Sequence, residues 1–388
     1  MKLRLFLLLP ILLIAALNTG CSRGVRNVNE AAKTYQNAQE KPVDLKSRDV
    51  KMPPLPDLNS KYWFNASPSI VEHLKGKVVL IDFWDYTCVN CIRTLPYIKE
   101  WYKRYEKDGL VIIGVHAPEF EFAKKRENVA NAIEKFGLKY PIVMDNDFRI
   151  WDMFGNQYWP AKYLFDKNGI LRYIHFGEGE YGNSEEMIQK LLKEINPNVK
   201  LPPLMEPIRA TDMPGAVCYR TTPETYLGYD RGVIGNKEGY VHDQVVSYSQ
   251  PASFDRDKFY LVGKWEIRPQ YVRYAGEGSD GVLAIDYIAA EASLVVRPDL
   301  RAASGQKEHQ PFKVYVYQDG KPVPKEDWSS DIRADSNGNT FISVDEPRMY
   351  YLIKNKEYGR HLLTLKPTSD EFAAYAFTFV TACETAPK

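Results

Sequence analysis

A short stretch near residue 80 joins a buried strand to a helix that begins at a cysteine. The apolar run of residues 78–84 predicts a buried strand, and a helix is expected to begin at Cys88, three residues before Cys91. Two thiols at this spacing can close a small disulfide. A helix N-terminus also favours the negatively charged thiolate of Cys88. The stretch therefore predicts redox chemistry.

A pair of cysteines at this spacing also serves as half of a zinc site in many proteins. Such a site needs a second pair of ligands with similar spacing. Cys218 and Cys383 stand alone in the sequence, and the six histidines are spread along the chain. We therefore expect a redox pair at Cys88 and Cys91, with no metal and no cofactor.

The segment around the two cysteines is similar to a known family. Residues 79–84 and 88–96 resemble the active-site region of the thioredoxin superfamily, and most closely its extracytoplasmic TlpA and DipZ branches. The similarity includes Pro96, five residues after Cys91, where these proteins carry a helix-kinking proline. The resemblance implies an α/β thioredoxin-like domain. It also implies that Cys88, exposed at the helix start, attacks a partner sulfur and that Cys91, buried within the helix, resolves the mixed disulfide.

Asp82 interrupts the apolar strand that leads to the cysteines. A carboxylate in such a place tends to have a raised pKa unless it is paired. Asp82 lies where thioredoxins carry a buried aspartate that assists proton transfer at the second cysteine, and Trp84 is expected to pack near the pair. The alternative is a structurally satisfied acid at the strand end. Asp85 and His116 are interpreted as solvated or hydrogen-bonded residues rather than catalysts.

Trp159 and Pro160 introduce the strand that ends near Asp166. A bond before proline is usually trans, and proline at the first position of a strand is common. Thioredoxin-like proteins, however, carry a cis proline beside their disulfide, and the backbone before it pairs with a substrate polypeptide. The resemblance therefore implies a cis Pro160, and Trp84, Trp159 and Pro160 become candidate substrate-contacting residues.

The remaining elements of residues 59–197 alternate between strands and helices. Strands are expected at 110–116, 141–143, 157–166 and 169–176, and helices at 68–74, 122–136 and 185–195 in addition to the helix that begins at Cys88. This alternation predicts a mainly parallel sheet covered on both faces.

The N-terminal residues have the features of an export signal. Basic residues precede an apolar run within residues 1–20, and the run is short for a membrane span. The following Cys21 resembles the lipid-modified cysteine of a bacterial lipobox. Residues 21–58 are polar and end in a proline-rich segment, which predicts a flexible tether. We therefore expect an exported lipoprotein anchored to a membrane that faces the periplasm or the cell exterior, with ordinary secretion as the alternative.

The number of cysteines fits this location. Lipidation of Cys21 leaves four of the five cysteines, which can form the redox pair and a structural disulfide between Cys218 and Cys383. Two separately buried thiols are the alternative for the second pair.

The second half of the chain is rich in predicted strands. Residues 198–255 are interpreted as a connector, and residues 256–388 as an all-β jelly-roll or sandwich of about eight short strands. Residues 316–322, 346–350 and 375–379 resemble the carbohydrate-binding-like sandwich of DipZ-type proteins. Trp265 and Trp328 could stack on a sugar, although single aromatic residues in a sandwich are more often core residues.

These features predict an exported, membrane-tethered thiol-disulfide oxidoreductase. The 388 residues carry a net charge of only +1, which indicates no nucleic-acid partner. The expected partners are extracytoplasmic thiol or disulfide proteins, with a membrane electron donor acting in trans. One alternative is a glycan-binding or adhesion lipoprotein with an inert thioredoxin-like domain. Another is a peroxide reductase, although Thr87 directly precedes Cys88 and the usual Thr-x-x-Cys arrangement is absent.

Overall fold

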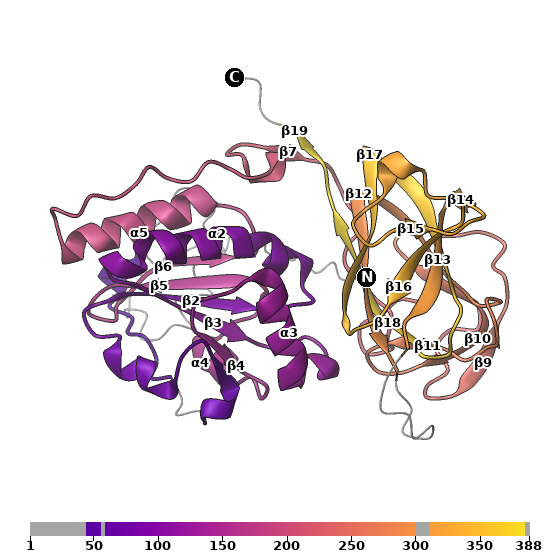
Figure 1. The fold of residues 1–388 in the computed structure, drawn as a ribbon, viewed down its shortest axis with the longest axis horizontal. Helices are drawn as coiled ribbons and strands as arrows, with labels where there is room; N and C mark the ends of the chain where they lie inside the picture. The colour runs from indigo at the N-terminus through magenta and orange to yellow at the C-terminus, as the bar shows by residue number, and fades with distance from the viewer. Residues whose placement is uncertain (1–43, 56–58, 300–309, 385–388) are drawn as a thin grey trace, which may run out of the picture.

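The chain folds into two sheet-based units that lie side by side (Figure 1). The computed structural model describes residues 44–55, 59–299 and 310–384. The predicted signal peptide, Cys21 and residues 21–43 of the predicted tether lie outside the described residues. Within the described ranges, no helix is long and apolar enough to cross a membrane.

The first unit is built on a six-stranded sheet in the order β1-β4-β3-β2-β5-β6. Its strands are β1 (Trp63–Phe64), β2 (Val78–Trp84), β3 (Leu110–His116), β4 (Ile142–Met144), β5 (Ala161–Phe165) and β6 (Leu171–Phe176). Only the pairs β2–β3 and β3–β4 are parallel, whereas the other three pairs are antiparallel. The sheet is therefore mixed and not mainly parallel, because β5 and β6 form a hairpin that runs back beside β2.

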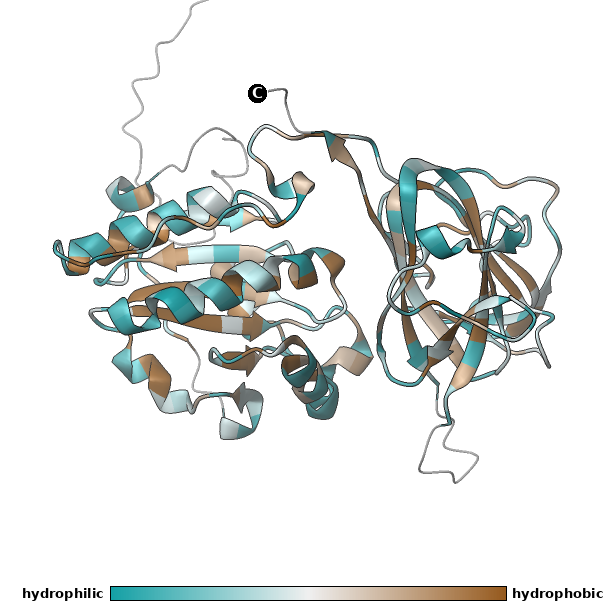
Figure 2. Cartoon of the chain, turned by 45° about the horizontal axis from the view of Figure 1, so that its top comes forward, coloured by the Kyte–Doolittle hydropathy of each residue, from teal (hydrophilic) through white to brown (hydrophobic). Residues whose placement is uncertain are grey.

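Helices and short 3-10 turns cover both faces of this sheet. The helices are α2 (Val89–Tyr105), α3 (Arg126–Phe136), α4 (Arg149–Phe154) and α5 (Tyr181–Ile195). The 3-10 turns of this unit are η1 (Leu45–Arg48), η2 (Ser60–Tyr62), η3 (Pro68–His73), η4 (Glu106–Asp108) and η5 (Glu121–Lys124). The apolar sides of α2, α3 and α5 pack on one face, and α4 with η1 packs on the other. Figure 2 shows hydrophobic residues concentrated on the strands and polar residues along the outer sides of the helices.

Strand β2 is buried on both faces. Leu80 and Trp84 pack into the core under α2, whereas Ile81 and Phe83 pack into the core on the opposite face. Alternate side chains of a strand point to opposite faces of its sheet, so a strand with both faces covered reads as a continuous apolar run. This is the physical reason for the apolar sequence that leads to the cysteines.

The described end of the predicted tether packs on the first unit. Leu45 and Val50 are 1% and 0% exposed and belong to the core beside α4. Asp44 accepts two hydrogen bonds from the buried guanidinium of Arg172, at 2.7 and 2.6 Å. The prediction of a flexible tether up to residue 58 is therefore wrong for residues 44–50, because two apolar side chains and one ion pair fix this segment.

The second unit is one antiparallel sheet of eleven strands that bends around its own core. Its strands are β8 (Thr225–Tyr226), β9 (Val245–Tyr248), β10 (Phe259–Ile267), β11 (Val272–Tyr274), β12 (Val282–Pro298), β13 (Phe312–Gln318), β14 (Lys321–Pro322), β15 (Arg333–Ala334), β16 (Thr340–Val344), β17 (Arg348–Pro367) and β18 (Phe372–Val380), with the 3-10 turn η8 (Lys325–Asp327). The all-β character predicted for this region is confirmed.

The long strands β12 and β17 hold this sheet together. They pair along most of their length, and β12 also pairs with β10 through its first half and with β18 through its second half. The expectation of only short strands is therefore wrong. Strands β8 and β9 lie within the range interpreted as a connector, yet they pair with β18 and β10.

The two tryptophans considered as sugar platforms are engaged inside the second unit. Trp265 is 0% exposed and lies in the core, so its ring cannot stack on a sugar. Trp328 is partly buried, packs against the same core and donates its ring N–H to the carbonyl of Val323 at 2.8 Å. The core-packing alternative holds for both residues.

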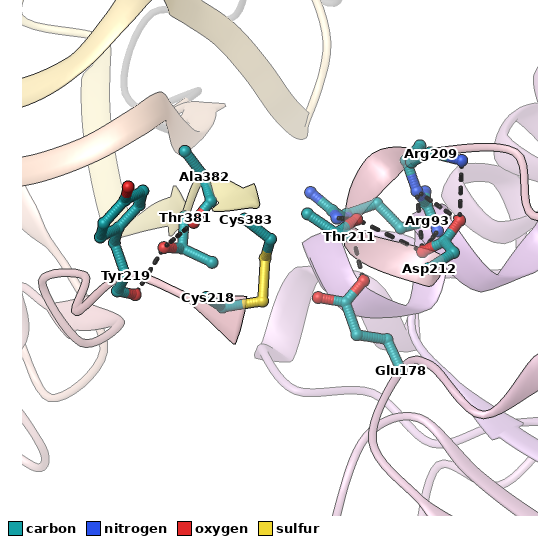
Figure 3. The surroundings of a disulfide bond; sticks show 10 residues. All are labelled: Arg93, Glu178, Arg209, Thr211, Asp212, Cys218, Tyr219, Thr381, Ala382 and Cys383. Carbon is teal, nitrogen blue, oxygen red and sulfur yellow. Dashed lines mark hydrogen bonds and ion pairs between the residues drawn. A yellow bond between two sulfur atoms is a disulfide. The ribbon is translucent and has the colours of Figure 1, made fainter. Parts of the chain in front are cut away.

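A two-stranded sheet ties the segment between the units to the end of the chain. Strands β7 (Val217–Cys218) and β19 (Cys383–Glu384) pair with each other, and a disulfide joins Cys218 to Cys383. Figure 3 shows this disulfide close to the turn η6 (Ala210–Asp212), where Arg93 of α2 donates to Thr211 at 2.8 Å. The segment before β7 is therefore anchored to the helix that carries the redox cysteines.

Candidate functional site

Cys88 and Cys91 lie at the start of α2, at the end of the sheet where β2 terminates. Cys88 is the N-cap residue, and its sulfur accepts a hydrogen bond from the backbone N–H of Cys91 at 3.2 Å. Both cysteines are present as free thiols. The first turn of α2 thus holds the two sulfurs in the arrangement that forms and breaks a disulfide within a Cys-x-x-Cys motif.

Both thiols are buried, and this differs from the prediction of an exposed Cys88. Cys88 is 8% exposed and Cys91 is 1% exposed. Burial raises the pKa of Cys88, and the nearby carboxylates of Glu119 and Glu224 raise this pKa further. Burial also raises the pKa of Cys91. The helix terminus favours a thiolate by only about 1 kcal/mol, so burial outweighs it in this conformation.

Asp82 is buried beneath the cysteines and faces a lysine. Lys162 of β5 lies directly opposite Asp82 of β2, and both residues are 1% exposed. Burial raises the pKa of Asp82 to about 7, and the charge of Lys162 opposes this rise. Burial lowers the pKa of Lys162 to about 8. The charge of Asp82 also raises the pKa of Cys91, so the acid, the lysine and the second thiol are electrostatically linked.

The candidate substrate-contacting residues occupy different environments. Trp84 is 0% exposed and packs edge-on against His116, so it supports the site from within and cannot contact a partner in this conformation. The bond between Trp159 and Pro160 is cis. Because Ala161 pairs with Phe83, Pro160 lies beside the end of β2 from which the chain leads to Cys88. Trp159 is half-buried and donates its ring N–H to the carbonyl of Ala117 at 3.0 Å.

Asp85 holds the turn that leads into α2. Its carboxylate accepts hydrogen bonds from the backbone and the hydroxyl of Thr87, at 2.6 and 2.5 Å, and from the backbone N–H of Glu119 at 2.9 Å. His116 lies 3.6 Å from Asp85, and burial lowers the pKa of His116 to about 3, so its imidazole is neutral. Asp85 is thus hydrogen-bonded and not solvated, since it is also fully buried.

The second unit covers the site through the loop that follows β3. The hydroxyl of Tyr226 and the guanidinium of Arg231 both donate to Glu119, at 2.6 and 3.0 Å. The rings of Phe120 and Phe122 pack edge-on against Tyr375, with centroids 5.0 and 4.8 Å apart. The core cluster that contains both redox cysteines also contains Tyr375. The site therefore lies at the interface of the two units.

Two residues of this site, Lys162 and Glu119, were not identified from the sequence. Lys162 could have been recognised in the sequence, because it is a charged residue inside an apolar strand, as Asp82 is. Glu119 left no signal, since an acid in a loop is usually solvated. Among the described residues, no group of three or more His, Cys, Asp or Glu side chains is arranged to hold a metal ion.

A thioredoxin-like sheet with two free thiols in the first turn of α2 defines a thiol-disulfide oxidoreductase fold and site. The chain belongs to the family of thioredoxin-like thiol-disulfide oxidoreductases. Residues 54–174 match the AhpC/TSA family, and residues 222–379 match the family described as thioredoxin like C-terminal domain.

Relatives of known name cover different parts of the chain. The protein DipZ of Mycobacterium tuberculosis is 38% identical over 237 residues, which are 60% of this chain and 33% of DipZ. The chain thus spans about a third of the length of the DipZ proteins that it matches. Thiol-disulfide oxidoreductase YkuV of Bacillus subtilis is 32% identical over 143 residues, which are 37% of this chain and 93% of YkuV. A solved thiol-disulfide isomerase from Corynebacterium glutamicum is 22% identical, with a TM-score of 0.31, and covers 36% of this chain and 96% of its own.

Proposed function

We propose that this chain is an extracytoplasmic thiol-disulfide oxidoreductase that exchanges disulfides with partner proteins through Cys88 and Cys91. The observation that carries the proposal is the pair of free thiols in the first turn of α2, with the sulfur of Cys88 3.2 Å from the backbone nitrogen of Cys91. The matches of residues 54–174 and 222–379 to two family models, and the similarity to the DipZ proteins and to YkuV, support it.

The reaction follows from thiol-disulfide exchange. The Cys88 thiolate attacks one sulfur of a partner disulfide, forms a mixed disulfide and releases the other partner sulfur as a thiolate. Cys91 then loses its proton and attacks the Cys88 sulfur, which closes the Cys88–Cys91 disulfide and releases the partner as a dithiol. The partner gains two electrons and two protons, and this chain loses them.

Asp82 and Lys162 are the groups that we propose handle the Cys91 proton. The pKa of Asp82 is raised to about 7 and that of Lys162 lowered to about 8, in both cases chiefly by burial. Acid-base groups transfer protons best when their pKa values lie near the working pH. Asp82 is therefore the proposed proton acceptor for Cys91, and Lys162 is the cation that stabilises the ionised acid.

The location and the electron supply are part of the same proposal. The apolar run within residues 1–20 and Cys21 support export and lipid anchoring. Reduction of one partner disulfide converts Cys88 and Cys91 to a disulfide, so a dithiol reductant must return two electrons before the next reaction. We propose a membrane electron donor for this step. Extracytoplasmic proteins with cysteine pairs are the proposed substrates.

The direct test is reduction of insulin disulfides together with trapping of partners. The wild-type protein should reduce insulin in the presence of dithiothreitol, and Cys88→Ser should abolish this activity. Cys91→Ala should accumulate mixed disulfides, because the resolving thiol is missing, and Cys88→Ala should trap none. Insulin reduction that survives Cys88→Ser, or no reducible adduct with either single variant, would contradict the proposal. Catalytic turnover of peroxide would favour the peroxide-reductase alternative instead.

A further inference from the structure

The second unit reaches the redox site through three hydrogen-bonding residues. Glu119, in the loop after β3, accepts hydrogen bonds from the hydroxyl of Tyr226 at 2.6 Å and from the guanidinium of Arg231 at 3.0 Å. Tyr226 belongs to β8, which pairs with β18 of the second sheet. The side chain of Glu119 is only 5% exposed. We call Glu119, Tyr226 and Arg231 the interdomain latch.

The latch connects directly to the turn that carries Cys88. The backbone N–H of Glu119 donates to Asp85 at 2.9 Å, and Asp85 accepts from the backbone and the hydroxyl of Thr87. Thr87 is the residue before Cys88. A continuous chain of hydrogen bonds therefore runs from Arg231 in the second unit to the residue next to the reactive thiol. Such networks hold a single arrangement when every member is satisfied.

Aromatic contacts complete the cover. The guanidinium of Arg231 lies 3.7 Å from the ring centroid of Tyr226 and 5.5 Å from that of Phe120. Phe120 in turn packs against Tyr375 of β18. Because Arg231 contacts both units, one side chain contributes an ion pair and two cation–π contacts to the closed state.

The closed state hides the thiol that the reaction requires. Cys88 is 8% exposed, and a partner sulfur has to approach it in line for exchange to occur. Burial, together with the carboxylates of Glu119 and Glu224, raises the pKa of Cys88. In this structure, in which the two units are in contact, the thiol is therefore both buried and protonated.

We propose that Glu119, Tyr226 and Arg231 are specificity-determining residues, which hold the second unit closed over Cys88 and so select the disulfides that reach it. This inference rests on the proposed function and deepens it. A partner has to separate the latch before exchange, so a polypeptide that binds the opened interface reacts, and a bulky partner that cannot bind there is excluded.

The latch is tested by alkylation of Cys88 in the full-length Cys91→Ala protein, read at Cys88 by peptide mass spectrometry. Iodoacetamide serves as the small probe, and a maleimide on a polyethylene glycol chain serves as the bulky probe. Arg231→Gln and Tyr226→Phe should raise the ratio of bulky to small modification about tenfold, because the closed interface excludes the bulky probe more than the small one and opening removes this difference. Arg256→Gln is the matched control, since Arg256 and Arg231 have equally exposed side chains and both form an ion pair.

The pH profile of Arg231→Gln separates opening from a simple change of charge. Loss of a nearby cation by itself raises the pKa of a thiol and slows alkylation, whereas opening of the latch lowers that pKa and speeds alkylation. Slower alkylation in Arg231→Gln, or an unchanged ratio of the two probes, would overturn the latch. Tyr226→Phe changes no charge, so it decides the question if Arg231→Gln fails to fold.

The outcome does not depend on whether a partner disulfide is ever found. Alkylation needs no partner, so the latch can be present in a protein that reduces no insulin, in which case only the proposed function fails. The converse outcome is insulin reduction that depends on Cys88, together with alkylation that Arg231→Gln and Tyr226→Phe leave unchanged. That result would support the proposed function and refute the interdomain latch.

Discussion

Lys162 lies directly opposite Asp82 across the pairing of β5 with β2, and both side chains are buried next to Cys91. Lys162 donates to the carbonyl of Gly177 at 3.2 Å, while one carboxylate oxygen of Asp82 has no hydrogen-bond partner. Burial raises the pKa of Asp82 and lowers that of Lys162. This pair is the proposed acceptor of the Cys91 proton.

Replacing Asp82 by Asn should slow the second step of exchange and leave the first step unchanged. Asn cannot accept the Cys91 proton, so release of the partner should slow on the order of 100-fold. Attack by Cys88 on an insulin disulfide should proceed at the wild-type rate. Rapid acid quench followed by mass spectrometry resolves the two steps. Asp152→Asn, at an exposed position, is the control. Equal slowing of both steps would contradict the assigned role.

The same substitution should change how stability depends on pH. The pKa of Asp82 rises from 3.8 to about 7 on folding, so the folded state binds the extra proton and stability falls as pH rises between these values. Asp82→Asn removes this loss and should stabilise the protein at pH 8 by roughly 4 kcal/mol, with little effect at pH 4. Urea unfolding at the two pH values measures the difference. A larger gain in stability at pH 4 than at pH 8 would contradict a raised pKa of Asp82.

Replacing Lys162 by Met should move the pH profile of partner release to higher pH. The charge of Lys162 lowers the pKa of Asp82, so its removal raises that pKa. At pH 7 less Asp82 is then ionised, and release should slow, whereas at pH 9 it should recover. Single-turnover rates across pH check this. Lys107→Met, at an exposed position, should leave the profile unchanged.

Replacing Asp44 by Asn should destabilise the protein at neutral pH, and the destabilisation should disappear only in strong acid. The hydrogen bonds from Arg172 hold the pKa of Asp44 well below its usual range, so the stabilisation is present above the unfolded value and is lost as pH falls. The partly exposed pair should contribute about 1 kcal/mol at pH 7. Thermal unfolding at pH 7 and near pH 1.5 measures it, with Glu72→Gln as the control. An equal loss at both pH values would mean that the ion pair is not the cause.

Removing the disulfide with Cys218→Ala and Cys383→Ala should destabilise the chain. The bridge joins residues separated by 165 positions, so it restricts the unfolded ensemble strongly, and its loss should cost about 3 to 5 kcal/mol on a loop-entropy estimate. Chemical unfolding of the double variant measures this. Non-reducing peptide mapping provides the chemical control, and free thiols at both positions in protein purified from an oxidising compartment would contradict the bridge.

The sequence predicted the redox strand and helix because the information is local. An apolar run, a short turn and two cysteines in one helical turn lie within about twenty residues, and their spacing already indicates the chemistry of Cys88 and Cys91. The charged Asp82 inside that strand was visible for the same reason. Turns and alternating strands likewise indicated an all-β second half.

Other features depend on contacts between distant segments, which a linear pattern does not record. The reverse direction of β5 beside β2 places Lys162 opposite Asp82, and the docking of the second unit places Tyr226 and Arg231 on Glu119. The sequence by itself thus determined which atoms can exchange a disulfide. Only the tertiary structure decided that Cys88 is covered and protonated, because burial and neighbouring charges are set by packing between segments far apart in the chain.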